Sequence, residues 1–360
     1  MRDIMDTVEQ WLHESKPVAL ATVAATWGSS PRQAGAKMAV TRELAMVGSV
    51  SGGCVESAVA EAAVEIIADG KPRLLTYGVS DDAAWEVGLA CGGKVSVYVE
   101  PLDLAWWRAA TSVIRNQHAL VTVTVIAGAH SGQKVMFDLR ENSIIYSSST
   151  LEPAQQEALI QAVKSQRTTG RAVFNGLEIL VDVVRPDPRL VIVGGAHVSQ
   201  VLAKFALMMG YGVIIIDPRA AFATAERFPG VSMLSHDYPD KVLPGLAIDS
   251  ETYIAVLTHD PKIDDPALRA ALPSPAPYVG VMSGKRSHEL RIERLTQAGV
   301  SAALIGRIHV PIGLFIGARL PEEVALSIMA EIVATKNTSS SSPDTTSKMS
   351  AEMPNRKVQT

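Results

Sequence analysis

The spacing of hydrophobic residues predicts strands and helices in the first half of the chain. Residues 18–25 form an apolar run typical of a strand, and residues 94–100 alternate apolar and polar side chains as a half-buried strand does. After Val55, apolar residues recur at helical spacing as far as Asp69-Gly70, which predicts an amphipathic helix. Further predicted elements are hairpins at 37–50 and 171–184, strands at 119–126, 134–138 and 144–146, and helices at 104–116 and 153–165. The mixture predicts an α+β domain.

The second half changes to continuous apolar runs separated by helical segments. Residues 190–193 and 213–216 are such runs, and a helical stretch at 198–209 lies between them. Continuous apolar strands that alternate with helices are typical of a parallel sheet covered on both faces. Further strands are expected at 253–257, 278–282 and 302–304. The fold class expected for the whole chain is α/β, with a mixed α+β N-terminal domain followed by a Rossmann-like, doubly wound parallel sheet.

The change of pattern coincides with the segment Arg185-Pro186-Asp187-Pro188. Two prolines in three positions disfavour helix and remove donors from a strand ladder, so the domain boundary is placed here. The prediction is an N-terminal domain at 1–186 and a Rossmann-like domain at 187–336. Residues 337–360 are rich in Ser, Thr, Pro and Lys with few large apolar side chains, and we expect them to be disordered.

Charge and cysteine content narrow the classes of function. The chain has 33 basic and 37 acidic residues and a formal net charge of −4, which argues against a nucleic-acid partner. No apolar run approaches the roughly 20 residues that span a bilayer, and residues 1–17 lack the apolar core of a signal peptide. We therefore expect a cytoplasmic protein without a membrane partner. Its two cysteines are expected to be free thiols.

Glycine and serine surround both cysteines. The motif Gly48-Ser49-Val50-Ser51-Gly52-Gly53-Cys54 opens a predicted helix, and Cys91-Gly92-Gly93 precedes a predicted strand. Backbone donors of Ser51, Gly52 and Gly53 form a nest suited to an anion, with Arg32 as a candidate for a charge-assisted contact. Cys54 is expected in the first turn of the helix, where the dipole favours the thiolate. The alternative is that both cysteines are inert core thiols, and no CxxC or histidine cluster with zinc-ligand spacing is present.

The second-half motif has the form of a nucleotide-binding turn. Gly194-Gly195-Ala196-His197 connects a strand to a helix, and Asp217 ends the next strand, about where a ribose-binding carboxylate is expected. The pair His259-Asp260 follows a later strand at the same carboxyl edge of the sheet. These loops predict a binding crevice. The alternative is a Rossmann fold without a ligand.

Together these motifs resemble the XdhC/CoxI family of accessory proteins. The resemblance runs from about Val18 to Ala334 and includes the cysteine motifs, the glycine turn, Asp217-Pro218-Arg219, Glu226-Arg227-Phe228-Pro229, Thr258-His259-Asp260 and Pro311-Ile312-Gly313-Leu314. It implies a protein that binds the molybdenum cofactor (molybdopterin) and promotes exchange of an oxo for a sulfido ligand with a cysteine desulfurase. It also implies that the loaded cofactor passes to an apo molybdenum hydroxylase such as xanthine dehydrogenase or aldehyde oxidase. Family members are chaperones and not subunits of the final enzyme.

The leading hypothesis is therefore a cofactor-binding maturation chaperone without turnover of its own. Arg32, Ser51, Gly52 and Gly53 would hold an anion, and Cys54 or Cys91 would contact molybdenum as a soft ligand. The second-half crevice would bind a nucleotide through Gly194, Gly195, Ala196, His197, Asp217, Arg219, His259 and Asp260.

Two alternatives stay open at the level of sequence. One is an NAD(P)-dependent oxidoreductase with Asp217 on the ribose and His259 as acid or base. The other is a sulfur carrier with a persulfide on Cys54. A homodimer is the expected oligomeric state, because dimers are the commonest assembly.

Overall fold

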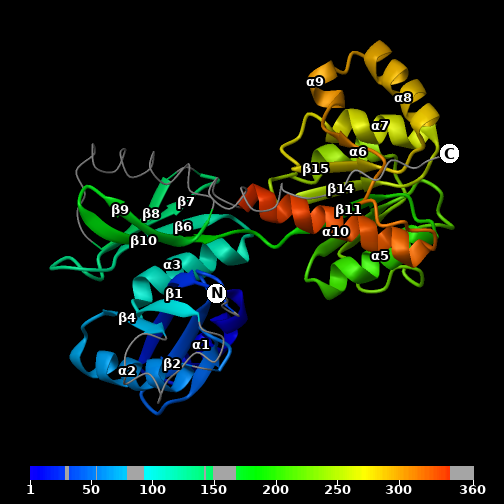
Figure 1. Cartoon of the computed structure of the whole chain (residues 1–360). Helices are drawn as coiled ribbons and strands as arrows, with labels where there is room; N and C mark the ends of the chain where they lie inside the picture. Colours follow the sequence, from blue (N-terminus) through cyan, green and yellow to red (C-terminus); the bar gives the residue numbers. More distant parts are fainter. Residues whose placement is uncertain (29–31, 54, 79–92, 142, 149–167, 341–360) are drawn as a thin grey trace. The chain divides into compact units, whose positions relative to one another are not determined.

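The computed structural model describes residues 1–28, 32–53, 55–78, 93–141, 143–148 and 168–340 (Figure 1). The chain divides into two compact units, Met1–Pro186 and Asp187–Thr360, and the division falls within the proline-rich segment. Each unit has its own apolar core.

The first unit begins with an antiparallel sheet that is covered on both faces. Its strands in spatial order are β3 (Met46–Gly48), β2 (Lys37–Thr41), β1 (Val18–Trp27), β5 (Lys94–Pro101) and β4 (Arg73–Gly78). Helix α2 (Glu56–Asp69) shares a core with one face, and α1 (Arg2–His13) and α3 (Leu104–Arg115) share a core with the other. In β1, Ala19 and Ala21 face α2 whereas Leu20 joins the core of α1 and α3, so the whole strand is apolar.

A second antiparallel sheet completes this unit. Its spatial order is β8 (Ser143–Ser147), β7 (Lys134–Asp138), β6 (Leu120–Val125), β10 (Leu177–Val184) and β9 (Gly170–Phe174). Two buried ion pairs join the sheets. Lys37 Nζ lies 2.6 Å from Asp182 Oδ2, and Lys134 Nζ lies 2.7 Å from Glu100 Oε1. The charges are paired because an isolated buried charge would be very costly.

The second unit is a parallel, doubly wound sheet, as predicted. Its spatial order is β13 (Met233–Ser235), β12 (Gly212–Ile216), β11 (Arg189–Val193), β14 (Thr252–Val256), β15 (Tyr278–Val281) and β16 (Ile308–His309). This is the Rossmann order 3-2-1-4-5-6, in which the order reverses between β11 and β14. A ligand crevice is expected at the carboxyl ends of those two strands.

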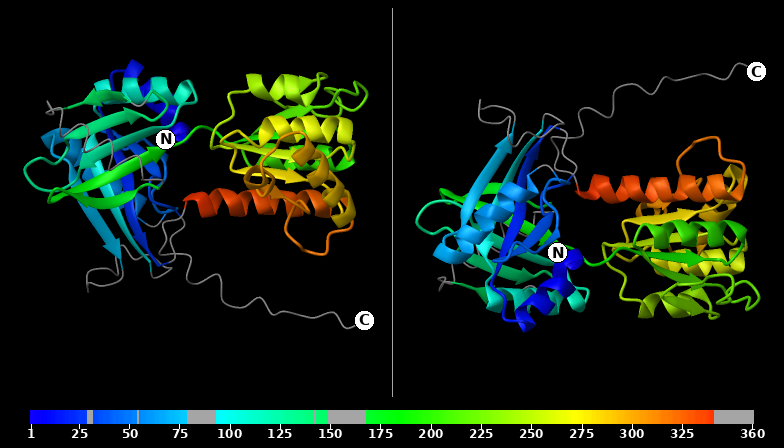
Figure 2. Two further views of the ribbon diagram at one scale, coloured as in Figure 1. Left: turned by 90° about the horizontal axis from the view of Figure 1, so that it is seen from above. Right: turned by 90° about the horizontal axis from the view of Figure 1, so that it is seen from below.

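Helices cover both faces of this sheet (Figures 1 and 2). Helix α5 (His197–Met208) and the long α10 (Pro321–Ser340) lie side by side on one face. The other face carries α6 (Pro239–Val242), the 3-10 turn Leu243–Gly245, α7 (Pro261–Ala271), α8 (Lys285–Gln297) and α9 (Ala302–Ile305). Coverage on both sides explains why β11, β12 and β14 read as continuous apolar runs.

Two expectations about this unit were wrong. Residues 302–304 form helix α9 and not a strand, and the last strand of the sheet is β16 instead. Ser301 caps α9 by accepting a hydrogen bond from Leu304 N, and a short apolar run cannot by itself distinguish a strand from a helix. The tail was expected to begin at 337, but α10 continues to Ser340, and residues 341–360 lie outside the described part of the chain.

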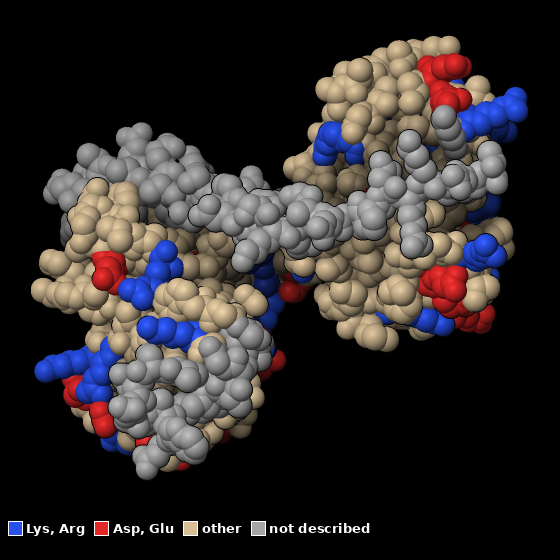
Figure 3. All heavy atoms as spheres, viewed as in Figure 1, with Lys and Arg blue, Asp and Glu red and all other residues tan. Residues whose placement is uncertain are grey.

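None of the described helices is long and apolar enough to cross a bilayer. On the face drawn in Figure 3, basic and acidic side chains are interspersed on both units. The helix predicted at 153–165 falls among residues that the structure does not describe.

Candidate functional site

The glycine-serine loop before α2 encloses the carboxylate of Glu56. Oε1 accepts hydrogen bonds from the Ser49 hydroxyl at 2.7 Å and from the backbone N–H groups of Val50, Ser51 and Gly52 at 3.2, 2.9 and 3.0 Å. Oε2 accepts from the Ser51 hydroxyl at 2.5 Å and from the N–H groups of Gly53 and Val55 at 2.8 and 3.2 Å. The loop is the predicted anion nest, and the anion that it holds is a side chain of the same protein.

These contacts control the ionisation of Glu56. Burial would raise the pKa of the carboxyl, but hydrogen bonds from Ser51, Ser49 and the backbone outweigh that effect and lower the pKa to about 2. Glu56 is therefore ionised at neutral pH. Gly52 and Gly53 adopt φ of 86° and 120°, a region that favours glycine and lets successive N–H groups turn towards one acceptor.

The structure brings Ser51, Gly52 and Gly53 together, and their backbone N–H groups donate to the Glu56 carboxylate. Sequence reasoning missed this residue. The signal was present, because a carboxylate at the start of a helix after two glycines is a natural acceptor for free N–H groups. Arg32 lies against the same loop, with Nε donating to the Ser49 carbonyl at 3.1 Å.

The cysteine positions can be followed only in part. Helix α2 begins at Glu56 and its N-cap is Val55. The prediction that Cys54 lies in the first turn of this helix falls on a residue that the structure does not describe. Cys54, Cys91 and Gly92 themselves lie outside the described residues. Gly93 is buried immediately before β5. The described residues contain no cluster of three or more potential metal-binding side chains.

The glycine turn after β11 is shaped by close contact with neighbouring segments. Gly194 has φ of 105°, and a Cβ at this position would lie 2.6 Å from Thr258 Cγ2. A Cβ on Gly195 would lie 2.2 Å from the carbonyl oxygen of Phe222. Both glycines are therefore required by the packing of the protein chain on itself, whether or not a phosphate binds here.

Asp217 is fully buried and bonded on both carboxylate oxygens. Oδ2 accepts from Gly195 N at 2.8 Å and from Arg219 Nη2 at 2.7 Å, while Oδ1 accepts from Arg219 N and Nε at 3.0 and 2.9 Å. Burial would raise the pKa of Asp217, but Arg219 and the Gly195 N–H lower it overall. The carboxylate connects the glycine turn to the loop that contains Arg219. The same carboxylate was proposed to accept a hydrogen bond from a ribose hydroxyl, but it already accepts hydrogen bonds from the protein itself.

The remaining predicted residues surround the carboxyl edge of the sheet. Ala196 is the N-cap of α5, and the largely exposed His197 opens that helix 3.8 Å from Glu322. Asp260 caps α7 by accepting from Lys262 N, and His259 has φ of 64°, a strained value for a residue other than glycine. The structure therefore brings the predicted second-unit residues to one edge of the sheet.

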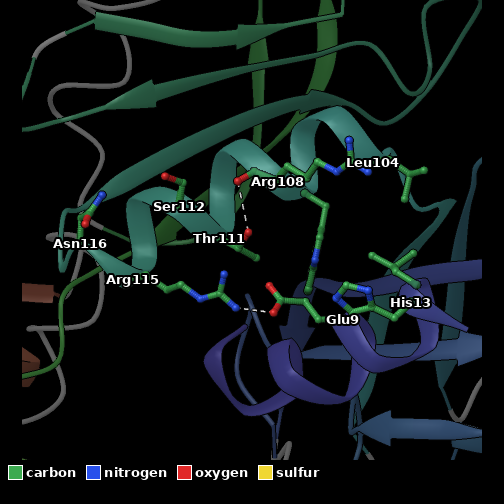
Figure 4. A pocket seen from close by; sticks show the side chains of 10 residues that line it. Glu9, His13, Leu104, Arg108, Thr111, Ser112, Arg115 and Asn116 are labelled. Carbon is green, nitrogen blue, oxygen red and sulfur yellow. Dashed lines mark hydrogen bonds and ion pairs between the residues drawn. The ribbon is translucent and has the colours of Figure 1, made fainter.

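A separate pocket opens between α1 and α3 in the first unit (Figure 4). It has a volume of about 540 Å³. Arg115 of α3 reaches across it to pair with Glu9 of α1, and His13 and Arg108 lie on its walls. None of the residues predicted from the sequence to bind a cofactor lines it.

Comparison with known proteins identifies related chains. The model of the XdhC and CoxI family matches residues 11–78, and the model of the XdhC Rossmann domain matches residues 190–332. The molybdenum cofactor insertion chaperone PaoD of Escherichia coli is 27% identical over 93% of this chain and 88% of its own length. A Bacillus subtilis protein named as a probable xanthine dehydrogenase subunit is 25% identical over 90% of this chain and 95% of its own length.

A solved structure has the same fold. The crystal structure of a protein described as a xanthine dehydrogenase from Bacillus halodurans superposes with a TM-score of 0.70 at 24% identity. The match covers 94% of this chain and 98% of that protein, so both units have counterparts in one known chain.

Proposed function

We propose that this chain, which the XdhC and CoxI family model matches over residues 11–78 and the XdhC Rossmann model over residues 190–332, is a molybdenum cofactor carrier that serves the maturation of a xanthine dehydrogenase-type molybdenum hydroxylase. The observation that carries the proposal is the alignment of 93% of this chain with a relative named as a molybdenum cofactor insertion chaperone. The cofactor is cargo in this proposal, received by the protein and passed to an apoenzyme.

The loop around Glu56 supports a role for Cys54 in holding that cargo. The N–H groups of Gly53 and Val55, which flank Cys54 in sequence, both donate to Glu56 Oε2. The backbone on either side of the cysteine is therefore anchored to one ionised carboxylate. A thiolate is a suitable soft ligand for molybdenum, and we assign this role to Cys54 or Cys91.

The remaining steps of the proposal are those that the resemblance to the family implies. We propose that a cysteine desulfurase supplies sulfur for an oxo-to-sulfido exchange on the bound cofactor, and that the protein works as a homodimer in the cytoplasm. In the second unit, His197, His259, Asp260 and the N–H groups opening α5 form the side on which a nucleotide part of the cofactor would bind. Asp217 and Arg219 stabilise the conformation of the glycine turn at that edge.

The alternative of an NAD(P)-dependent oxidoreductase has less support. It assigns Asp217 to a ribose hydroxyl, and this carboxylate already accepts four hydrogen bonds from Gly195 and Arg219. A ribose could use it only after one of these contacts is broken. We therefore do not extend the proposal to a dehydrogenase.

Anaerobic titration with molybdenum cofactor tests the carrier proposal. Molybdenum and pterin that stay with the protein through gel filtration would be measured for wild type, Cys54→Ala and Cys91→Ala. Ser57→Ala is a matched control, because this side chain is exposed at the start of α2, close to Cys54 in the sequence. We expect near-stoichiometric retention by wild type and the control, and weaker retention by at least one cysteine variant. Absence of retention by wild type would refute the proposal, and equal retention by all variants would remove the thiols from it.

The same variants test the sulfur-carrier hypothesis. Incubation with a cysteine desulfurase and cysteine would add one sulfur atom to Cys54 if a persulfide forms there. Intact-protein mass spectrometry under anaerobic conditions would detect the adduct, and its absence from wild type would exclude that role.

A further inference from the structure

The pocket between α1 and α3 lies within the first unit (Figure 4). Both helices pack on the same apolar core, and the pocket between them has a volume of about 540 Å³. Its lining residues are spaced three and four apart on each helix, because residues at that spacing share one helix face. A volume of this size is within the range of pockets that bind small organic molecules.

One part of the pocket lining is apolar. Trp107 is 1% exposed and belongs to the core that the two helices share, so it closes the pocket on the inner side. Leu12 of α1 packs partly against that core, whereas Leu104 of α3 is 48% exposed. Contact with apolar ligand atoms would remove Leu104 from water, which favours binding through the hydrophobic effect. The pocket therefore suits a ligand with an apolar body.

The charged part of the lining is basic on balance. Arg108 and Arg115 carry two positive charges and Glu9 carries one negative charge, which leaves one net positive charge when His13 is neutral. Arg115 and Glu9 form an ion pair across the pocket (Figure 4). Arg108 is exposed, and its guanidinium has no ion pair or hydrogen bond with any residue that the structure describes. The unbalanced positive charge is therefore accessible to a ligand.

This combination of groups favours a ligand with a single negative charge. A guanidinium can donate two parallel hydrogen bonds to one carboxylate, and Arg108 is accessible for such a contact. Glu9 in the same wall repels further negative charge, so a doubly charged phosphate matches the pocket less well than a carboxylate does. A cation would be repelled by the net positive charge, and a neutral ligand would leave Arg108 without a counter-charge.

We propose that the pocket between α1 and α3 binds a small organic monocarboxylate. Arg108 donates hydrogen bonds to the carboxylate, and the apolar body of the ligand lies against Leu104 and Trp107. The ion pair of Arg115 with Glu9 positions the two helices on either side of the ligand. None of the residues assigned to the molybdenum cofactor lines this pocket, so the site goes beyond the carrier proposal and does not depend on it.

Calorimetric titration of the full chain with 4-phenylbutyrate tests the site. The matching amide has the same apolar body without the charge, and 4-phenylbutyl phosphate carries the same ring with a larger negative charge. Arg108→Gln removes the unpaired charge, and Leu104→Ser removes the exposed apolar side chain. Arg171→Gln is the matched control, because Arg171 is exposed on β9 and does not line the pocket. Circular dichroism would establish that each variant is folded, and the two pocket variants test the site independently.

We expect 4-phenylbutyrate to bind wild type and Arg171→Gln saturably, with a dissociation constant of about 1 mM, the scale for a ligand of this size. Arg108→Gln should weaken binding about three- to tenfold, as for loss of a charge-assisted contact at the surface, and the amide should bind wild type more weakly by a similar factor. Leu104→Ser should weaken binding of both the carboxylate and the amide.

Three results would overturn the proposal. They are no saturable binding of 4-phenylbutyrate to wild type, equal affinity of Arg108→Gln and the control for it, and binding of the amide or the phosphate as tight as that of the carboxylate. No molybdenum cofactor is present in this assay, so its failure is distinct from failure of the carrier proposal.

Discussion

Replacing Glu56 with glutamine tests whether this carboxylate organises the loop that contains Cys54. The carboxylate accepts seven hydrogen bonds from the loop between Ser49 and Val55. Glutamine has the same shape but offers one acceptor oxygen, and its NH₂ group would face N–H donors. The variant should keep helix α2, which depends on its own buried face, and lose order in the loop.

The lowered pKa of Glu56 indicates how much stability the Glu56→Gln substitution should remove. A decrease from 4.5 to about 2 corresponds to about 3 kcal/mol. The side chain is only partly buried, so solvent screening reduces the effect to about 1–2 kcal/mol. Since the folded pKa is below the ordinary value, this stabilisation is complete above about pH 4.5 and is lost as the pH falls towards 2.

Hydrogen exchange measured by mass spectrometry on the peptide covering residues 48–56 would detect the change. A loss of about 1–2 kcal/mol in local opening free energy predicts exchange about 5- to 30-fold faster at pH 7. Glu61→Gln is the matched control, because Glu61 is exposed on the same helix. Unchanged exchange in Glu56→Gln, or the same increase in Glu61→Gln, would show that the carboxylate does not hold the loop.

Three further predictions test the packing inside each unit. Asp217→Asn should lower the free energy of unfolding by about 1–2 kcal/mol in urea denaturation, because a buried amide replaces the carboxylate that accepts from the Gly195 N–H and pairs with Arg219; a purely ligand-binding role predicts little loss. Gly195→Ala should lower the thermal midpoint, since the new Cβ would lie 2.2 Å from the Phe222 carbonyl oxygen, and an unchanged midpoint would mean that the loop moves freely. Lys37→Met should cost about 3–5 kcal/mol by leaving Asp182 buried without its partner, and a second substitution, Asp182→Leu, should recover much of it in the same denaturation assay. No recovery in the double variant would contradict the explanation based on an unpaired charge.

The sequence by itself determined the class of fold and the order of most elements. Runs such as residues 190–193 and 213–216 are apolar because both faces of each strand are covered, and that property can be read without coordinates. The helix after the first cysteine motif could be predicted in the same way, because its apolar residues recur at the helical period. Family motifs with a characteristic order were also readable along the chain.

Short elements and side-chain partners required the tertiary structure. Residues 302–304 were predicted as a strand from their apolar character alone, although Ala and Leu favour a helix, and the Ser301 side chain caps the helix that forms. The glycines at 194 and 195 suggested room for a phosphate, whereas the structure fills the adjoining space with Thr258 and Phe222.

The same limit applies to the charged groups of the candidate sites. Asp217 suggested a ribose contact, because the sequence does not show that the N–H of Gly195, 22 residues earlier, donates to it. Glu56 is different, because its donors lie within seven residues and the sequence carried that signal. Glu9 and Arg115 are far apart in sequence, and only the packing of α1 and α3 on one core brings them together. Periodicity reports which face of an element is buried, but a hydrogen bond between distant residues depends on where the whole chain places them.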